Sequence, residues 1–262
     1  MNQKRILYED QDIIVCHKAS GIATQTKRIG QADMVSEISN YLSYAKPDGG
    51  QRQKAPYAGV VHRLDQPVEG ILVFAKNKDT AARLSGQIAE EGTEKYYYAI
   101  ACGRNFVREG RLEDYLLKDG RTNMSSVVPP EVKGAKRAVL HYEVLAEKKV
   151  IPGSETITDA EAYQADADGY RIALVRIRLY TGRHHQIRVQ MSHAGMSLLG
   201  DYKYADAEAV RISEQMKIRS IALCAYRLSF RHPGTGKRME FQIRPEGHIF
   251  QMEEFAEQIC FF

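Results

Sequence analysis

Short runs of β-branched, aromatic and aliphatic residues follow one another along this 262-residue chain, and they do not alternate regularly with helical segments. The clearest runs are ILVFAK at 71–76, KYYYAIACG at 95–103 and AVLHYEVL at 138–145, whose residue types favour strands. Regular strand–helix alternation is typical of a doubly wound parallel sheet, whereas an excess of strands without it predicts an α+β fold.

Other segments are assigned by spacing and composition. Helices are predicted, from apolar residues at helical spacing, over 31–44, 77–92, 206–217 and a short segment that ends at Gly195. Loops are predicted, from polar and turn-forming residues, over 44–56, 104–137 and the acidic stretch 150–169. In the strand that follows, the apolar positions change parity, which predicts a bulge near Val175. No linker divides the chain, so a single domain over 1–262 is expected.

Composition excludes several classes of protein. The formal net charge of +4 is too small to establish a nucleic-acid partner by itself. The cysteines at 16, 102, 224 and 260 form no close pair, which argues against a disulfide scaffold or a cysteine metal site. The chain has no signal-peptide pattern and no apolar run near the roughly 20 residues of a membrane span. A soluble cytoplasmic protein is therefore predicted.

The sequence contains no complete version of a common cofactor-binding or metal-binding motif. GTGKR at 234–238 lacks the earlier glycine of a phosphate-binding loop and is expected to be a hairpin turn. His184, His185 and His193 have no carboxylate at ligand spacing, so no metal site is predicted. Neither a dinucleotide-binding nor a nucleophile-elbow motif occurs. The sequence therefore predicts no cofactor.

A charged tetrad, His62–Arg63–Leu64–Asp65, interrupts two apolar runs at 59–77. An Asp in a turn after a strand usually bonds only the local backbone. Two distant segments change this interpretation. They are EKYYYAIACG at 94–103 and LYTGRHHQIRVQMSHAGMSLLGDYKY at 179–204.

Together these segments resemble the pseudouridine synthases of RNA, and specifically their RluA-type family. The tetrad with Gly70 resembles the signature around the family's catalytic aspartate, and Lys95-x-Tyr97-x-Ala99 resembles the strand with its active-site tyrosine. The third motif is matched by Thr181-Gly182-Arg183, His185–Val189, and Leu198–Asp201 with Tyr204. The likeness extends over about residues 6–250, and three motifs in the family's order are a specific signal.

The resemblance implies a mixed, mainly antiparallel sheet with a central cleft, flanked by helices and loops. It also implies that neither a metal nor a cofactor takes part. No separate N-terminal RNA-binding domain is expected, because strand-forming residues begin almost at Met1. RNA, either tRNA or rRNA, is the expected partner, and a monomer with no obligate protein partner is the default expectation.

Three residues are expected to be catalytic. Isomerising uridine requires cleavage of the N-glycosidic bond, rotation of the base and attachment through C5, for which an ionised carboxylate acts as nucleophile or base. By analogy with the family, Asp65 is this carboxylate and Arg188 is the guanidinium that keeps it charged. Tyr97 is expected to pack against the uracil and to assist removal of the C5 proton, on the strand face opposite to its two tyrosine neighbours.

Further residues are expected to bind the RNA. A target base must leave its stack, and the planar guanidinium of Arg63 suits the vacated space. His62 is placed with the RNA-binding residues, although shaping the loop is its favoured role. Phosphate contacts are expected from Arg176, Arg178, Arg183, His184 and Gln186.

The chain departs from the family pattern at a few positions. Val68 and Glu69 replace the usual Thr and Ser before Gly70, and His184 replaces a usual Thr. Glu69 weakens RNA binding if it faces the cleft and is neutral if it points away. These changes keep an alternative open, namely a non-catalytic RNA-binding or RNA-folding factor with the same cleft. A hydrolase with an Asp nucleophile is a third interpretation, but it lacks a second catalytic carboxylate in a recognisable motif.

Overall fold

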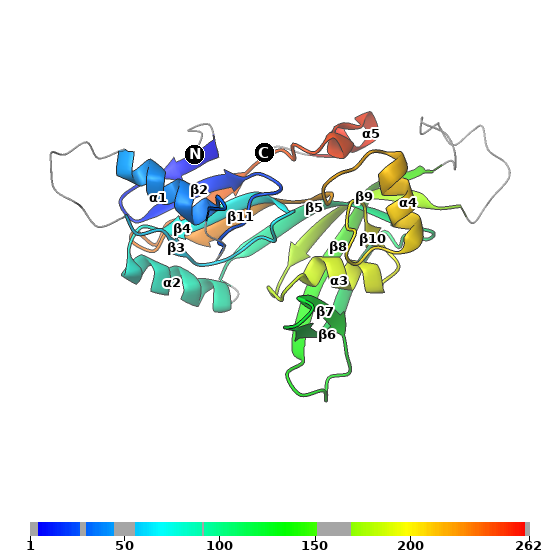
Figure 1. Ribbon diagram of the computed structural model, residues 1–262, viewed down its shortest axis with the longest axis horizontal. Coiled ribbons are helices and arrows are strands. Elements are labelled where there is room, and N and C mark those ends of the chain that lie inside the picture. Colours follow the sequence, from blue (N-terminus) through cyan, green and yellow to red (C-terminus); the bar gives the residue numbers. More distant parts are fainter. Residues whose placement is uncertain (1–4, 27–29, 45–55, 91, 151–168, 260–262) are drawn as a thin grey trace. The chain divides into compact units, whose positions relative to one another are not determined.

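The structure is a computed structural model that describes residues 5–26, 30–44, 56–90, 92–150 and 169–259. Strands outnumber helices and pair mainly antiparallel (Figure 1), which confirms the predicted α+β class. None of the helices in the described part of the chain has the length and apolar character needed to cross a membrane. The chain divides into two compact units, 1–94 with 225–243 and 95–224 with 244–262. That these two units act together as a single catalytic domain stays a prediction.

The first unit is built around two buried strands, β2 (Ile13–Lys18) and β4 (Glu69–Ala75), which pair antiparallel. Every residue of both strands is buried, which explains the unbroken apolar runs Ile13–Cys16 and Ile71–Ala75 in place of alternation. The other elements of this unit are β1 (Ile6–Glu9), α1 (Met34–Tyr44), β3 (Gly59–Val60), α2 (Lys78–Ala89), most of β11 (Leu223–Arg231) and β12 (Arg238–Gln242).

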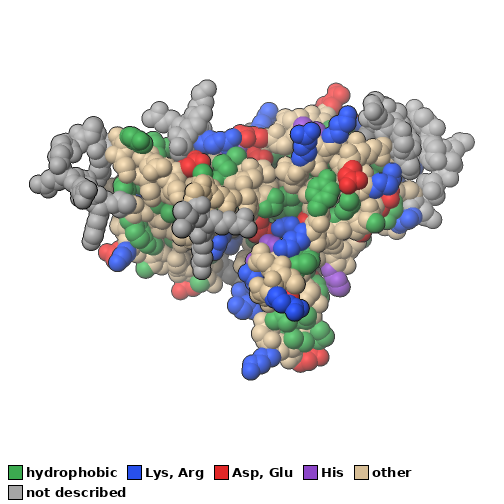
Figure 2. Space-filling model, viewed as in Figure 1, with side chains coloured by type: hydrophobic (Ala, Val, Ile, Leu, Met, Phe, Trp, Pro, Cys, Tyr) green, Lys and Arg blue, Asp and Glu red, His purple; other side chains and the backbone are tan. Residues whose placement is uncertain are grey.

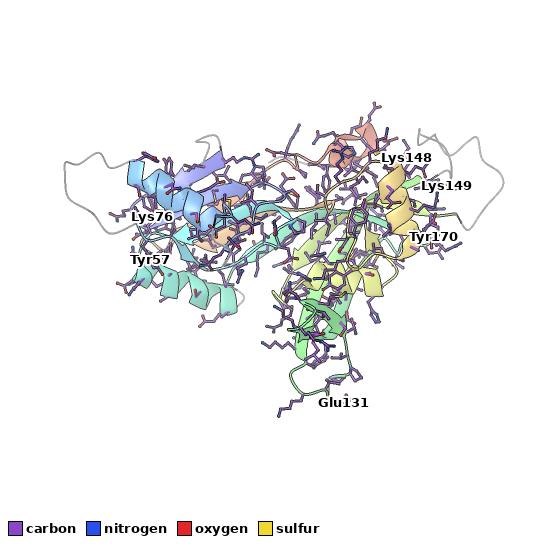
Figure 3. The ribbon with its side chains drawn as sticks, in the orientation of Figure 1. Tyr57, Lys76, Glu131, Lys148, Lys149 and Tyr170 are labelled. Atoms are coloured by element: carbon purple, nitrogen blue, oxygen red, sulfur yellow. The ribbon has the colours of Figure 1, made fainter. Side chains whose placement is uncertain are left out.

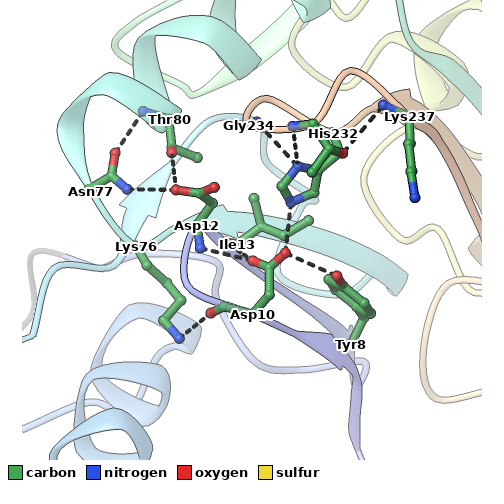
Figure 4. Close-up of polar contacts among 11 residues, drawn as sticks. Tyr8, Asp10, Asp12, Ile13, Lys76, Asn77, Thr80, His232, Gly234 and Lys237 are labelled. Atoms are coloured by element: carbon green, nitrogen blue, oxygen red, sulfur yellow. Dashed lines mark hydrogen bonds and ion pairs between the residues drawn. The ribbon is translucent and has the colours of Figure 1, made fainter.

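A buried histidine ties the β1–β2 turn to the β11–β12 turn (Figure 4). His232 Nε2 lies 2.8 Å from Asp10 Oδ2, and its Nδ1 accepts hydrogen bonds from the amides of Gly234 and Thr235. Because Nδ1 is an acceptor, Nε2 carries the proton that is donated to Asp10. The other oxygen of Asp10 accepts from two amides of its own turn. The predicted GTGKR turn is confirmed, and this network fixes it.

We expect Asp10→Ala to lower the free energy of unfolding by about 2–4 kcal/mol, because four donors lose their acceptor. Partial burial on its own raises the pKa of Asp10, but hydrogen bonds from Ile13, Asp12, Tyr8 and His232 outweigh it and hold this pKa below 3.8. The contribution is therefore complete above pH 3.8 and is lost as the pH falls through the lower folded-state pKa. Urea unfolding of the wild-type protein and of Asp10→Ala at neutral and acid pH checks this. A difference in unfolding free energy between the two proteins that widens in acid contradicts it.

The second unit contains an antiparallel sheet in the order β5–β9–β8–β6–β7, with β10 beside β5. Its strands are β5 (Glu94–Gly103), β6 (Glu109–Asp119), β7 (Met124–Val127), β8 (Lys136–Lys149), β9 (Arg171–Leu179) and β10 (Ser197–Leu198). Its helices are α3 (Gln186–His193), α4 (Ala207–Gln215), the 3-10 turn His248–Gln251 and α5 (Glu253–Ala256). Strands β6 and β7 with the start of β8 form an arm that bears Lys and Arg side chains (Figure 2), with Glu131 at its tip (Figure 3).

Two predictions about this unit are wrong. The segment 104–137 was expected to be a loop, but it contains β6 and β7. In β6 one face is exposed, and the other, which carries Gly110, Leu112 and Asp114, is only half-buried and partly polar, so the strand lacks the apolar alternation that marks a strand in sequence. The bulge expected near Val175 is at the predicted position but in the other strand: β8 has an extra residue between Val144, the partner of Val175, and Ala146, the partner of Leu174, while β9 pairs regularly with β5. Most of the predicted loop 44–56 and of the acidic segment 150–169 lies outside the described residues.

Candidate active site

The tetrad His62–Asp65 lies in the loop between β3 and β4, and backbone hydrogen bonds fix its course. The amide and the carbonyl of the buried Leu64 both bond the Thr24 hydroxyl, at 3.2 and 2.9 Å. The Val68 amide donates to the Asp65 carbonyl at 3.0 Å. The Asp65 side chain is half-buried, and Arg63 is exposed. The charged tetrad that follows β3 therefore forms an anchored turn, in which Arg63 is exposed while His62 and Asp65 are half-buried.

A buried lysine holds this loop from the neighbouring strand. Lys18 is fully buried, and its Nζ donates to the carbonyls of Ala19, Ile22 and Gln66 at 3.1, 2.7 and 3.0 Å. Gln66 follows Asp65 directly, so the ammonium fixes the main chain on one side of the acid. Burial lowers the pKa of Lys18 to about 8, and the charges of Asp65 and Glu69 act to raise it. The side chain is therefore charged at neutral pH, as three hydrogen bonds to carbonyls require.

Gly70 ends the loop in a conformation that favours glycine, with φ at +147°. A Cβ at this position lies 2.4 Å from the Ala225 Cβ and 2.7 Å from its amide nitrogen. We therefore expect Gly70→Ala to destabilise the protein by about 2–4 kcal/mol through strain and overpacking. Gly86→Ala in α2 is the control, because its Cβ meets nothing within 4 Å and helix propensity favours Ala. Equal urea midpoints for the two variants contradict this prediction.

The departures at Val68 and Glu69 are both buried. Glu69 Oε1 lies 3.0 Å from Nε2 of the buried His17, so its charge faces an internal partner. His62 Nε2 accepts a hydrogen bond from the Val73 amide at 3.1 Å. This contact gives His62 the loop-shaping role favoured from the sequence, and its contact with RNA stays a prediction.

Tyr97 is buried on the face of the second unit's sheet that α3 covers. It pairs with Ile177, which in turn pairs with Tyr142, and cross-strand partners share a face. On the same face, four residues before Tyr142 along β8, Ala138 packs against Val189 of α3. The predicted catalytic phenol and the helix that carries Arg188 therefore lie on one side of the sheet.

Arg188 is buried and forms a two-point pair with Asp201. Its Nε donates to Asp201 Oδ2 at 2.8 Å and its Nη2 to Oδ1 at 2.6 Å. The guanidinium carbon lies 5.0 Å from the centre of the Tyr204 ring. Arg188 is therefore not a solvated charge on the surface of its helix.

The residues predicted to bind phosphate fall into two groups. Arg176 and Arg178 pair across the strands with Tyr98 and Tyr96, so they lie on the face opposite to Tyr97. Arg176 also forms an ion pair with Glu143, and Arg178 lies over the rings of Tyr96 and Tyr180. The sheet therefore separates Arg176 and Arg178 from Tyr97, and their contact with RNA stays a prediction.

The other group lies around the start of α3. Arg183 is exposed and donates to the Arg137 carbonyl, whereas His184 stacks on His185 and bonds the Ser125 hydroxyl. Gln186 is buried, and its amide bonds neighbouring groups inside the unit. Gln186 therefore holds this loop in place, and its contact with RNA stays a prediction. Contacts of Arg183 and His184 with RNA stay predictions.

Asp65 belongs to the first unit, and Tyr97 and Arg188 belong to the second. Within each unit the predicted residues occupy defined local settings: an anchored loop for Asp65, and one face of a sheet for the other two. Their convergence in one cleft stays a prediction.

Comparison with known proteins decides the family. The sequence profile of the family described as RNA pseudouridylate synthase matches residues 12–193. The chain belongs to the RNA pseudouridylate synthase family. A similar relative is "Ribosomal large subunit pseudouridine synthase D" of Pseudomonas aeruginosa, 31% identical over 244 residues that cover 90% of this chain and 67% of the relative. Another is "tRNA pseudouridine synthase C" of Yersinia pestis, 26% identical over 240 residues that cover 91% and 85%.

A solved structure confirms the pseudouridine synthase fold. "Human RNA Pseudouridylate Synthase Domain Containing 4" matches with a TM-score of 0.66 and 20% identity, covering 98% of this chain and 92% of that one. The predictions of the family, of the fold class and of the enzyme class are therefore confirmed. Members of this family isomerise uridine in RNA to pseudouridine.

Sequence reasoning about this pseudouridine synthase missed several side chains around the predicted site. Lys18 and Thr24 hold the Asp65 loop, and Asp201 pairs with Arg188. Asp201 stood in the third motif without a role. The signal for Lys18 is a charged residue at the end of a strand that is otherwise apolar, in IIVCHK. Such a residue needs internal partners.

Proposed function

We propose that this pseudouridine synthase modifies a uridine in structured RNA of the tRNA or rRNA class. The single observation that carries the proposal is the family match over residues 12–193, which includes the Asp65 loop, Tyr97 and Arg188. The names of the two relatives above support both classes of RNA and do not choose between them. We further propose that the protein acts as a monomer in the cytoplasm, with RNA as its partner.

In the proposed mechanism, Asp65 supplies the ionised carboxylate for cleavage of the N-glycosidic bond. Its loop is anchored at Leu64 and Gln66 while its side chain stays half-buried, which suits a group that must meet an incoming nucleotide. Arg188 pairs with this carboxylate during the reaction and keeps it charged and oriented. The exposed Arg63 fills the place of the everted base.

Tyr97 is the proposed neighbour of the uracil ring. It lies on the sheet face that α3 covers, which is the face expected to be dry enough for base stacking. A phenol in this position also assists removal of the C5 proton after the base has rotated. The base is released and recaptured inside the site, so no free uracil is produced.

The test is incubation of the purified protein with tRNA and rRNA that carry tritium at C5 of uridine. We expect tritium release with equal formation of pseudouridine. RNA binding without release supports the alternative of a non-catalytic RNA-binding factor, and free uracil supports a hydrolase. The non-catalytic alternative rests on the departures from the family pattern at Val68 and Glu69. The fold buries both residues, and His17 lies beside the Glu69 carboxylate.

A further inference from the structure

Two residues of the segment Gly200–Tyr204, namely Asp201 and Tyr204, contact the Arg188 side chain, although this segment is not part of α3. Two of the five N–H donors of the guanidinium bond the two carboxylate oxygens of Asp201. The Asp201 side chain is 1% exposed and that of Arg188 is 7% exposed, so water does not compete for this pair. A two-point contact fixes both the plane of the guanidinium and its rotation within that plane.

Tyr204 adds a second constraint on the same group. Its ring lies under the guanidinium, 5.0 Å from ring centre to Cζ. Its hydroxyl accepts from the Ser125 amide at 2.9 Å and shares a 2.7 Å hydrogen bond with His185 Nδ1. The ring is thereby held at its far end by two different elements, the β7 strand and the start of α3.

The local backbone explains how Asp201 reaches this position. Gly200 has φ of +73°, and a Cβ there lies 2.2 Å from the Ser220 carbonyl oxygen. The Gly200 amide donates to the Ser213 hydroxyl at 2.9 Å, and the Asp201 amide donates to the Leu198 carbonyl at 3.2 Å. This tight turn directs the Asp201 carboxylate onto the helix that carries Arg188.

We propose that Asp201 and Tyr204 are positioning residues that orient the Arg188 guanidinium for catalysis. The inference rests on the proposed function, in which Arg188 pairs with the reacting carboxylate. A long arginine side chain has several rotamers, and a misplacement of about 1 Å at a reacting group costs on the order of 100-fold in rate. Asp201 and Tyr204 act on the reaction through Arg188 and not through contact with the RNA.

The test measures kcat and KM for tritium release with Asp201→Asn and Tyr204→Phe. Asp201→Asn keeps the shape of the side chain but places an amide N–H against an arginine N–H. Tyr204→Phe keeps the ring and removes only the hydroxyl. We expect kcat to fall by about 100-fold and about 10-fold, respectively, with KM within about 3-fold of wild type, because substrate binding does not use these groups.

A second background shows whether the effect passes through Arg188. In Arg188→Lys the two-point pair is already absent, so adding Asp201→Asn should lower kcat by less than about 5-fold. Asp206→Asn is the matched control, a nearby carboxylate that caps α4 and bonds Ser197. It should lower the melting temperature and leave kcat unchanged.

Wild-type protein that releases no tritium overturns the proposed function and is recognised before any variant is compared. With active wild type, the proposal is overturned if Asp201→Asn lowers kcat equally in both backgrounds, or if Asp201→Asn and Tyr204→Phe both keep full kcat. If circular dichroism shows that Asp201→Asn does not fold, Tyr204→Phe decides. Unchanged kcat in that variant then overturns the proposal, and a fall in kcat without a rise in KM supports it.

Discussion

Asp65→Asn is expected to lower the rate of pseudouridine formation by more than about 1,000-fold while the protein stays folded. An amide is neither a nucleophile of comparable strength nor a base, so the N-glycosidic bond stays intact. The bonds from Thr24 and Val68 that anchor this loop meet the backbone of Leu64 and Asp65, and Asp65→Asn keeps this backbone. The substitution therefore removes chemistry and leaves the course of the main chain in place.

Tritium release and the urea midpoint, measured on the same preparation, separate these two effects. Asp79→Asn is a suitable control, because this acid is exposed in the first turn of α2 in the same unit. It should keep full activity. An Asp65→Asn protein with wild-type activity would refute the role assigned to this carboxylate. It would not refute the activity of the protein as a pseudouridine synthase.

Lys18→Met is expected to lower the free energy of unfolding by about 2–3 kcal/mol at pH 7. The thioether fills a similar volume, but the partly buried carbonyls of Ala19 and Ile22 lose their donor. The release of a buried ammonium offsets part of this loss. The Gln66 carbonyl keeps its bond from the Gly21 amide, so the Asp65 loop loosens without detaching. We therefore also expect kcat to fall by about 10- to 100-fold.

The pH dependence of this variant gives a signed test. Burial lowers the pKa of Lys18 from 10.5 to about 8, so the folded protein binds this proton less tightly than the unfolded chain does. Between pH 8 and 10.5 the unfolded chain carries more protons, and wild-type stability relative to Lys18→Met rises with pH. The interval of 10.5 − 8 = 2.5 pH units corresponds to about 3 kcal/mol at most. A stability gap that narrows above pH 8 contradicts this account.

Local patterns predicted the elements that are buried or clearly amphipathic. The helix expected over 77–92 is α2, which begins after the Asn77 cap, and the strand expected at 95–103 is β5. The arm formed by β6 and β7 was missed because the inner face of β6 is only half-buried and includes Gly110 and Asp114, so the sequence carries no periodic apolar signal there. Strand pairing across the sheet stabilises them, and this is a contact between distant segments.

The sequence motifs of the candidate site could be predicted, but the contacts that hold these motifs in place could not. The tetrad at 62–65 was correctly separated from the strands on either side of it. The sequence did not reveal that Thr24 and Lys18 anchor this loop, since those bonds join residues 40 and 48 positions apart. Arg176 and Arg178 were grouped with the site because they are near the third motif in sequence. Strand alternation and the register with β5 place them on the far face.

The most direct test of the central claim uses RNA from a strain that lacks the gene, because its target uridine is unmodified there. This RNA is incubated with purified wild-type or Asp65→Asn protein, and pseudouridine is mapped at single-nucleotide resolution. We predict that wild type converts one or a few uridines in tRNA or rRNA, and that Asp65→Asn converts none. Binding of this RNA by the wild-type protein without a new pseudouridine at any position would contradict the claim.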